Sequence, residues 1–426
     1  PKIYKMIKVI DCSKKKYLSE LIKFLDKRRL GNQKNIKIVS KIIKDVKKNK
    51  KKALLKYEKK FSKNFEIIPS QKKINKSIKT LDPKVKKAID FAFSRILKFH
   101  SLQKAKDLIY KDKYDNKIEY RHVPIQSIGI YVPANLPSTL LMNAIAAKIA
   151  GVKRIVLANP KINGKLNPAV LYAAKKIGIK EIYSMGGAQA IGSLAYIQKV
   201  NKIIGPGNIF VAQAKKEVFG NVGIEGNIAG PSEITIVADN KTEFEEVLTS
   251  MIGQAEHDEN SQCILITKDL NLIKNINRKI GIALKELPRS SIARRSLKKN
   301  GLILKVKSDK QIINAVNEIA PEHLELNVNN YKKYLNKIQN AGSICIGKYS
   351  PMAASDYNVG TNHVLPTMSS AKFSSGLNLN EFYKKISLIK LSKKGVEVIG
   401  KSATHLAEYE QLFGHALSIR SRMRRK

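Results

Sequence analysis

Residues 125–158 read IQSIGIYVPANLPSTLLMNAIAAKIAGVKRIVLA, and this stretch decides the fold class. The apolar run IGIYV indicates a buried strand, Ser138 to Ala150 predict a helix that Gly151 ends, and RIVLA indicates the next strand. A strand, a helix and a second strand in this order are typical of a βαβ unit with parallel strands.

The same alternation continues to the end of EITIVAD at Asp239 and resumes more loosely between residues 261 and 350. Further helices are expected in NPAVLYAAKKIG, AQAIGSLAYI and IFVAQAKKEVF, and further strands in EIYSM and KIIG. We therefore expect mainly parallel sheets covered by helices, with ligands near the carboxyl ends of the strands.

The two ends of the chain follow a different pattern. In the first third, Val39, Ile42, Ile43 and Val46 recur at helical spacing between lysines, and Asp82-Pro83 predicts the start of a second amphipathic helix. The last 45 residues or so also look helical, and they end in the basic tail RSRMRRK.

The net charge of +46 is the one abnormal number in a composition that is otherwise globular. Residues 1–120 carry +25, residues 121–260 only +3, and residues 261–426 carry +18. Such an excess suggests a nucleic-acid-binding basic protein. Against this, Lys dominates, Trp is absent and the lysines are spread over many helices, whereas nucleic-acid recognition favours Arg forks and stacking aromatic rings. We therefore expect no nucleic-acid partner, and a coding-composition bias offers another explanation for the lysines.

Membrane and secreted classes are also disfavoured. The chain has no run of about 20 apolar residues, and its amino-terminal PKIYKMIKVIDCSKKK lacks the apolar core of a signal peptide. The three cysteines, Cys12, Cys263 and Cys345, are too few and too scattered for a disulfide framework or a four-thiolate zinc site. These features predict a cytoplasmic protein that does not enter a membrane.

Polar side chains with catalytic or metal-binding chemistry gather in four segments. In MIGQAEHDENSQC, Gln254 and His257 would share one face of a helix, so they could bind a metal such as zinc, although on spacing alone a capped helix end is the simpler explanation. Glu322 and His323 follow Pro321, where we expect a helix to begin. They could divide two proton transfers, or the acid could simply favour the helix dipole.

The other two segments lie further along the chain. Asp356 and His363 fall in a long, charge-poor loop, SPMAASDYNVGTNHVLPT, of a kind that is usually functional or closely packed. Glu410 and His415 are five residues apart and cannot share a helix face, so one of them should lie near a helix end. The glycine turns SMGGAQAIG and IIGPGNIF suit a ligand at a helix N-terminus, but neither completes a dinucleotide fingerprint.

Taken together, these segments resemble the histidinol dehydrogenase family. The match is collinear from about Ile125 to His415. It rests on the strings LLMNAIAAKIAGV, GGAQAIGSLAY, GPGN, AGPSEI, GQAEHDENSQ, APEHLEL, NAGSI, SPMAASDYNVGTNHVLPT and FSSGL.

The resemblance implies an α/β fold with two incomplete Rossmann-like doubly wound domains and small helical segments at both termini. Residues 1–31 would form the N-terminal helical segment, and residues 32–122 with 233–376 the first, discontinuous α/β domain. Residues 123–232 would form the second α/β domain. Residues 377–426 would form a C-terminal helical segment that is exchanged between the subunits of a homodimer.

The resemblance also implies a zinc-dependent enzyme that oxidises L-histidinol to L-histidine in two steps with reduction of two NAD. It implies Glu322 and His323 as the catalytic acid/base pair. The implied ligands of one zinc ion per subunit are Gln254, His257, Asp356 and His415. The implied substrate contacts are Ser232, Gln254, His257, His323, Asp356, Glu410 and His415, and the implied NAD contacts are Tyr131, Gln189 and Asn208.

One departure from the family bears on the cofactor. Between YVP and PST the family usually carries a longer loop with a glycine pair, whereas this chain has only Ala134, Asn135 and Leu136. This shortening predicts an active enzyme with weaker NAD binding, and a catalytically weakened homologue is the alternative.

Overall fold

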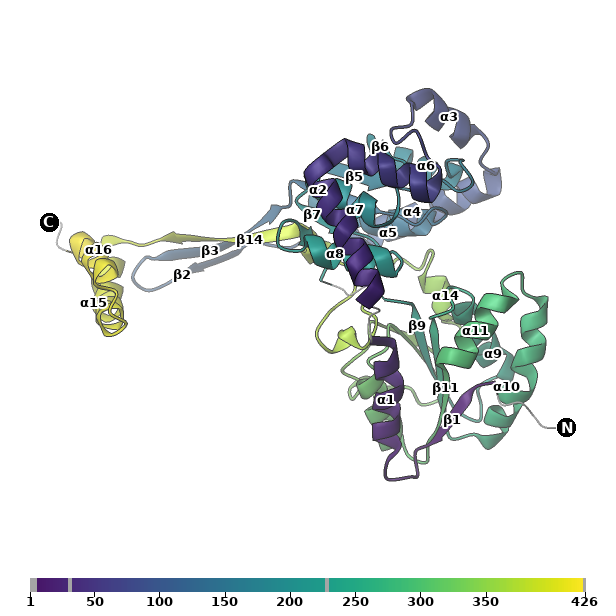
Figure 1. The fold of residues 1–426 in the computed structure, drawn as a ribbon. Coiled ribbons are helices and arrows are strands. Elements are labelled where there is room, and N and C mark those ends of the chain that lie inside the picture. Colours follow the sequence, from purple (N-terminus) through teal and green to yellow (C-terminus); the bar gives the residue numbers. More distant parts are fainter. Residues whose placement is uncertain (1–5, 30–32, 227–229, 424–426) are drawn as a thin grey trace.

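The structure, a computed structural model, describes residues 6–29, 33–226 and 230–423. Two α/β units form the body, and a long antiparallel arm extends from it with two helices at its tip (Figure 1). Residues 1–5, 30–32, 227–229 and 424–426 lie outside the described residues, so a small part of each predicted segment is not covered.

A five-stranded parallel sheet in the order β6-β5-β4-β7-β8 forms the first unit. Its strands are β4 (Ser127–Tyr131), β5 (Arg154–Ala158), β6 (Glu181–Tyr183), β7 (Lys202–Ile204) and β8 (Gly223–Ile224). The chain enters at the central strand, adds two strands on one side and then crosses to the other, which is the order of an incomplete Rossmann sheet.

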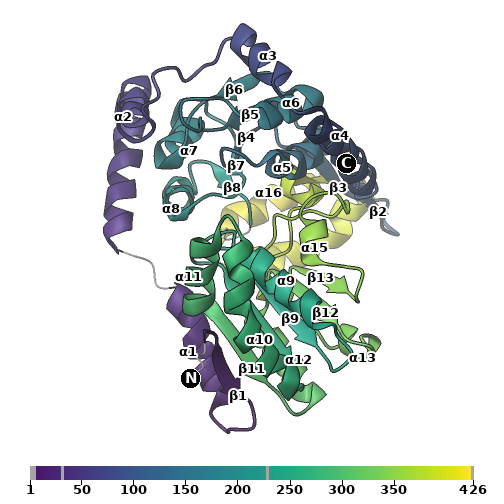
Figure 2. The same cartoon turned by 90° about the vertical axis from the view of Figure 1, so that its right-hand side faces the viewer.

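Helices cover both faces of this sheet (Figure 2). One face packs on α3 (Gln71–Lys79), α4 (Pro83–Ser101), α5 (Pro137–Ala150) and α6 (Pro168–Ile177). The other packs on α2 (Gln33–Ser62), α7 (Gly187–Tyr196) and α8 (Ile209–Val218). The predicted helix starts are confirmed at Asp82, which caps α4, and at Asn167, which caps α6.

A six-stranded parallel sheet in the order β1-β11-β10-β9-β12-β13 forms the second unit. Its strands are β1 (Lys8–Asp11), β9 (Glu233–Ala238), β10 (Gln262–Thr267), β11 (Gly301–Lys305), β12 (His323–Asn327) and β13 (Ser343–Ile346). Helices α9 (Phe244–Ala255), α10 (Leu270–Ala283) and α11 (Ser290–Asn300) cover one face. Helices α1 (Tyr17–Arg29) and α12 (Asp309–Ile319) cover the other. The predicted fold class of two incomplete Rossmann-like units is confirmed.

The grouping of segments differs from the predicted domains. Residues 33–101, expected to join residues 233–376, pack instead on the five-stranded sheet, where Ile43 and Val46 of α2 contact Gly192 of α7. Residues 6–29, expected to be a separate helical segment, supply both β1 and α1 to the six-stranded unit. Amphipathic spacing shows which face of a helix is buried, but it does not show which sheet covers that face.

The arm is a three-stranded antiparallel sheet of β14 (Tyr383–Lys390), β3 (Lys117–Pro124) and β2 (Leu108–Lys111). At its far end α15 (Lys393–Tyr409) and α16 (Phe413–Met423) pack on each other, and Gly400 lets Met423 approach closely. The prediction that residues 377–426 are helical is therefore wrong for β14. The segment YKKISLIK pairs with β3 over its whole length and so forms a strand.

The remaining elements are short. They are α13 (Lys332–Leu335), α14 (Met352–Ser355) and the 3₁₀ turns η1 (Leu284–Glu286), η2 (Ser370–Lys372) and η3 (Leu379–Phe382). Within the described ranges, no helix combines the length and the apolar character that a membrane span needs.

Candidate active site

The predicted proton-transfer pair lies at the amino end of β12. Glu322 comes directly before the strand, and His323 is its first residue, in register with Ile234 of β9 and Ser343 of β13. The expectation that Pro321 begins a helix is therefore wrong. Strands on both sides bond the backbone of HLELN and bury most of its side chains, and this pairing outweighs the local proline signal.

The substrate-side residues gather at the amino ends of the six-stranded sheet, whereas we expected ligands near carboxyl ends. Ser232 directly precedes β9, and its carbonyl accepts a hydrogen bond from the Gln262 N–H at the start of β10. Gln254 lies in the last turn of α9, the helix that leads back to this end of the sheet. The predicted substrate contacts therefore lie at the opposite end of this sheet from the one we expected.

Glu322, His323 and Asp356 form a close group in the body. Glu322 Oε2 accepts a 2.7 Å hydrogen bond from the backbone N–H of Glu233. His323 Nε2 lies 3.9 Å from Glu322 Oε1 and 3.6 Å from Asp356 Oδ1. The side chains of Glu322 and His323 are only 7% and 3% exposed, so water screens these interactions little.

Burial sets the protonation states of this group. It raises the pKa of Glu322 well above its usual range and raises the pKa of Asp356 to about 7. It lowers the pKa of His323 to about 3, and the imidazoles of His363 and His257 act in the same direction. His323 is therefore a neutral proton acceptor near pH 7, and Glu322, once ionised, is a stronger base than an exposed carboxylate.

His363 belongs to this group although we assigned it no role from the sequence. Its Nδ1 lies 2.7 Å from the backbone carbonyl of Asp356, so the ring fixes the loop that carries that carboxylate. Burial lowers the pKa of His363 to about 4, which keeps the ring neutral near pH 7.

Gln254 lies in the last turn of α9, and His257 follows just after the helix ends. The N–H of His257 donates to the carbonyl of Gln254 over 3.3 Å, two residues beyond the last residue of the helix. Gln254 is buried, whereas His257 is exposed, and desolvation by the surrounding protein still lowers the pKa of its ring.

The donor set of this region suits a zinc ion in part. An amide, an imidazole and a carboxylate, from Gln254, His257 and Asp356, are ligands that zinc accepts. Gln254 Nε2 and His323 Nδ1 are buried without a hydrogen-bond partner in the described structure, which is typical of a site that a ligand completes. Within the described parts of the chain, however, no three His, Cys, Asp or Glu side chains form a group that could hold a metal.

The other predicted ligands are not in the body of this chain. Glu410 directly follows α15 and His415 lies in the first turn of α16, both at the tip of the arm, far from the six-stranded sheet (Figure 1). A turn between the two helices separates them, so helical spacing does not constrain the pair. Both residues are exposed, and no residue described at the tip belongs to the Glu322 group.

The predicted cofactor contacts lie at the carboxyl ends of the five-stranded sheet, as expected there. Tyr131 is the last residue of β4, and its hydroxyl accepts a 3.3 Å hydrogen bond from the Gly187 N–H at the start of α7. Gln189 lies in the first turn of α7. Asn208 caps the neighbouring helix, α8, by accepting from the N–H groups of its first turn.

Glu58, which we did not predict, holds the turn before α7. This buried residue of α2 accepts 2.9 Å hydrogen bonds from the Gly186 N–H and from Gln189 Nε2. Burial raises the pKa of its carboxyl group. A carboxylate at a helix N-terminus is favourable, and here it also fixes the side chain of a predicted cofactor contact.

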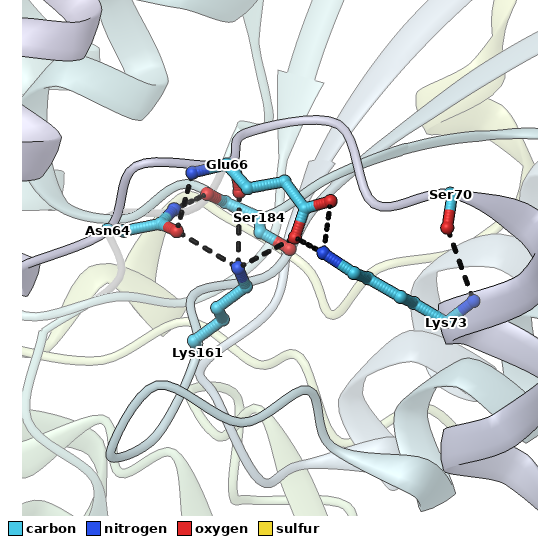
Figure 3. A network of polar contacts seen from close by, with 6 residues as sticks. All are labelled: Asn64, Glu66, Ser70, Lys73, Lys161 and Ser184. Carbon is cyan, nitrogen blue, oxygen red and sulfur yellow. Dashed lines mark hydrogen bonds and ion pairs between the residues drawn. The ribbon is translucent and has the colours of Figure 1, made fainter.

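A polar network ties the chain after α2 to the same strand ends (Figure 3). Asn64 Nδ2 donates to the Ser184 carbonyl over 2.6 Å, and Lys161 Nζ donates to Asn64 Oδ1 over 3.0 Å. Glu66 accepts from Lys73 over 2.8 Å and lies 3.5 Å from Lys161 Nζ. The network fixes the segment that leads from β6 into α7.

Two further residues, Glu233 and Arg28, form a buried ion pair in the six-stranded unit and were not assigned from the sequence. Glu233 could have been noticed, since it is an acid at the start of the fully buried strand EITIVA. Arg28 offered no signal, because it is one basic residue among many in a lysine-rich segment.

Similar proteins agree on one family. A sequence model described as Histidinol dehydrogenase matches residues 25–423. The chain belongs to the histidinol dehydrogenase family. It is 60% identical to the histidinol dehydrogenase of Pelagibacter ubique (strain HTCC1062) over 99% of this chain and 100% of that protein. It is 41% identical to that of Bacillus subtilis (strain 168) over 93% of this chain and 95% of that protein.

A solved structure of the same family shares the fold. The histidinol dehydrogenase crystal structure from Elizabethkingia anophelis superposes with a TM-score of 0.90 at 37% identity, covering 99% of this chain and 98% of that chain. Membership of the histidinol dehydrogenase family makes this chain an enzyme of the oxidoreductase class.

Proposed function

We propose that this chain oxidises L-histidinol to L-histidine through L-histidinaldehyde, with NAD as the oxidant in both steps. Family membership and the buried Glu322–His323 pair support this proposal. The first step removes a hydride and a proton from the alcohol. The second step adds water to the aldehyde and removes a second hydride, so one histidinol reduces two NAD.

The two buried side chains would divide the proton transfers. His323 is neutral near pH 7 because burial lowers its pKa, so its ring would accept the alcohol proton as hydride leaves. The carboxylate of Asp356, whose Oδ1 lies 3.6 Å from His323 Nε2, would stabilise the resulting imidazolium. Glu322 would then take a proton from the water that attacks the aldehyde.

The remaining predicted residues would bind the substrate, the zinc ion and NAD. Gln254, His257 and Asp356 of one subunit, with the partner subunit's His415, would hold one zinc ion per subunit, which would orient the amino alcohol as a template. Ser232 and the partner subunit's Glu410 would complete the substrate site. The NAD contacts would be Tyr131, Gln189 and Asn208, beside the turn that Glu58 holds.

A homodimer with exchanged arms is part of the proposal. The arm and its tip carry large apolar side chains that this chain leaves exposed: Leu108, Ile109, Tyr110, Ile389, Leu406, Tyr409, Phe413 and Leu417. Such a surface is typical of an interface. A second copy would cover it and bring His415 and Glu410 to the other subunit's body. The predicted cytoplasmic location remains a prediction.

The test is an assay of purified protein with histidinol, NAD and zinc, repeated after chelation. We expect two NADH per histidinol, loss of turnover on chelation and recovery with zinc. Absence of NADH with zinc bound would indicate a catalytically weakened homologue. DNA binding that survives physiological salt, without NAD reduction, would favour the nucleic-acid alternative.

A further inference from the structure

Arg28 of α1 reaches into the unit that carries the active site. Its guanidinium is buried, and Nη1 lies 2.6 Å from Glu233 Oε1 in an ion pair whose side chains are 7% and 3% exposed. Its Nη2 donates to the Pro231 carbonyl over 2.9 Å. The two branches of one planar group therefore hold both ends of the tripeptide Pro231–Ser232–Glu233.

The same tripeptide holds the carboxylate of Glu322. The backbone N–H of Glu233 donates to Glu322 Oε2 over 2.7 Å, and the Glu233 side chain also accepts from the Met368 N–H over 2.8 Å. The continuous contact from Arg28 through Glu233 to Glu322 joins the first helix of the chain to the proposed base of the second oxidation.

Docking of α1 does not require this ion pair. Leu21, Phe24 and Leu25 of α1 are buried in the core of the six-stranded unit and supply its apolar contacts. Buried ion pairs contribute little net stability compared with apolar packing of the same volume, whereas they fix geometry. The position of the pair, one backbone hydrogen bond from Glu322, therefore points to the active site.

We propose that Arg28 is a positioning residue that, through Pro231 and Glu233, sets the place of the Glu322 carboxylate for the oxidation of the aldehyde. This inference rests on the proposed function. The alcohol step depends on His323, to which Arg28 has no such connection, so loss of Arg28 should separate the two steps.

The test uses histidinaldehyde as the common substrate of the zinc-loaded enzyme. With NAD the enzyme oxidises the aldehyde, and with NADH it reduces the aldehyde to histidinol, which is the first step in reverse. The ratio of the two rates does not depend on the amount of folded protein, so a merely structural role of Arg28 would leave it unchanged.

Three variants separate position from charge and stability. Arg28→Met removes the guanidinium and its charge, whereas Arg28→Lys keeps the positive charge but loses the two-branched guanidinium that bonds both Pro231 and Glu233. Arg28→Met/Glu233→Gln removes both charges and should restore the melting temperature that Arg28→Met loses. In all three we expect the ratio of oxidation to reduction to fall ~10- to 100-fold.

Arg154→Met is the matched control. Arg154 also bonds one carboxylate, that of Glu181 over 2.8 Å, and one backbone carbonyl, that of Gln198 over 2.8 Å, but it does so in the other unit. We expect its ratio to equal that of the wild type. An unchanged ratio in Arg28→Met and Arg28→Lys, with only a lower melting temperature, would overturn the inference. A wild-type enzyme that catalyses neither reaction would overturn the proposed function, and this inference with it.

Discussion

His323 and Glu322 are sequence neighbours whose proposed roles differ because burial shifts their pKa values in opposite directions. Burial lowers the pKa of His323 to about 3, whereas it raises the pKa of Glu322 well above its usual range although the Glu233 N–H opposes that shift. The two side chains therefore suit different steps of one reaction.

Replacing each residue by Ala should separate those steps. We expect His323→Ala to slow hydride transfer from histidinol by ~10²- to 10⁴-fold, and Glu322→Ala to slow mainly the oxidation of histidinaldehyde. Stopped-flow measurement of NADH with each substrate checks both effects. Equal and mild effects of both variants would show that the proton roles are misassigned.

His100 of α4 supports the loop that carries His363. Its Nδ1 lies 3.1 Å from the Ile96 carbonyl and must carry the proton, so Nε2 accepts from Asn362 Nδ2 at 3.3 Å. Asn362 also donates to the Met142 carbonyl over 2.8 Å. The neutral ring can make both contacts, and burial lowers its pKa more than the backbone hydrogen bonds with Ile96 and Gly360 raise it.

The neutral state of His100 should make stability depend on pH. Because the pKa is lower in the folded than in the unfolded protein, the unfolded state binds the proton first, and stability falls as the pH drops below the unfolded value of about 6.5. Urea unfolding at pH 7.5 and 5.5 should show this loss, and His100→Gln should reduce it. An identical pH dependence in the variant would exclude His100 as a contributor.

At the scale of elements, long periodic segments were predictable and short or context-dependent ones were not. Helices α5 and α6 and strands β4 and β5 follow from apolar spacing and capping residues that lie within each segment. Strand β12 was missed because its state depends on pairing with β9 and β13, which lie outside its own segment. The candidate site followed the same rule: residues in long specific strings could be proposed from the sequence, whereas Arg28 pairs with a residue more than 200 positions away.

The turn before α7 gives a prediction for one element. Glu58→Ala would leave the Gly186 N–H and Gln189 Nε2 buried without their acceptor, which should cost ~1–3 kcal/mol of unfolding free energy. It should also raise the KM for NAD, because Gln189 loses its fixed orientation. Glu58→Gln retains an acceptor oxygen and is the control. We expect it to remain close to wild type in both measurements, and a KM for NAD unchanged in Glu58→Ala would argue against the cofactor role of this turn.

At the scale of the whole molecule, the arm separates α16, which carries His415, from the six-stranded unit, which carries His323 (Figure 1). Two inactive variants should therefore complement each other in a mixed dimer. In a heterodimer of His323→Ala and His415→Ala subunits, the body with intact His323 would receive the intact arm of its partner. We expect each homodimer to be inactive and the co-expressed mixture to recover activity. No recovery in isolated heterodimers would show that the arm acts on its own subunit or not at all.

The grouping of segments into units could not be read from the sequence, because the chain reaches the six-stranded sheet twice. The distribution of charge along the chain was more useful than helix spacing for locating the predicted site. The region from 121 to 260, which carries only +3, supplies the five-stranded sheet and two of the predicted zinc ligands. The lysines of α2 and α4 lie mostly on exposed helix faces.

The pairing of Lys8 in β1 with Leu302 in β11 has a consequence for synthesis of the chain. The first strand and helix to leave the ribosome cannot find their sheet until most of the chain has been translated, whereas all strands of the five-stranded sheet lie between residues 127 and 224. Such non-local pairing is slow to form. In pulse-labelled hydrogen exchange during refolding we therefore expect β4 and β5 to gain protection before β1 and β11. Simultaneous protection would contradict this order.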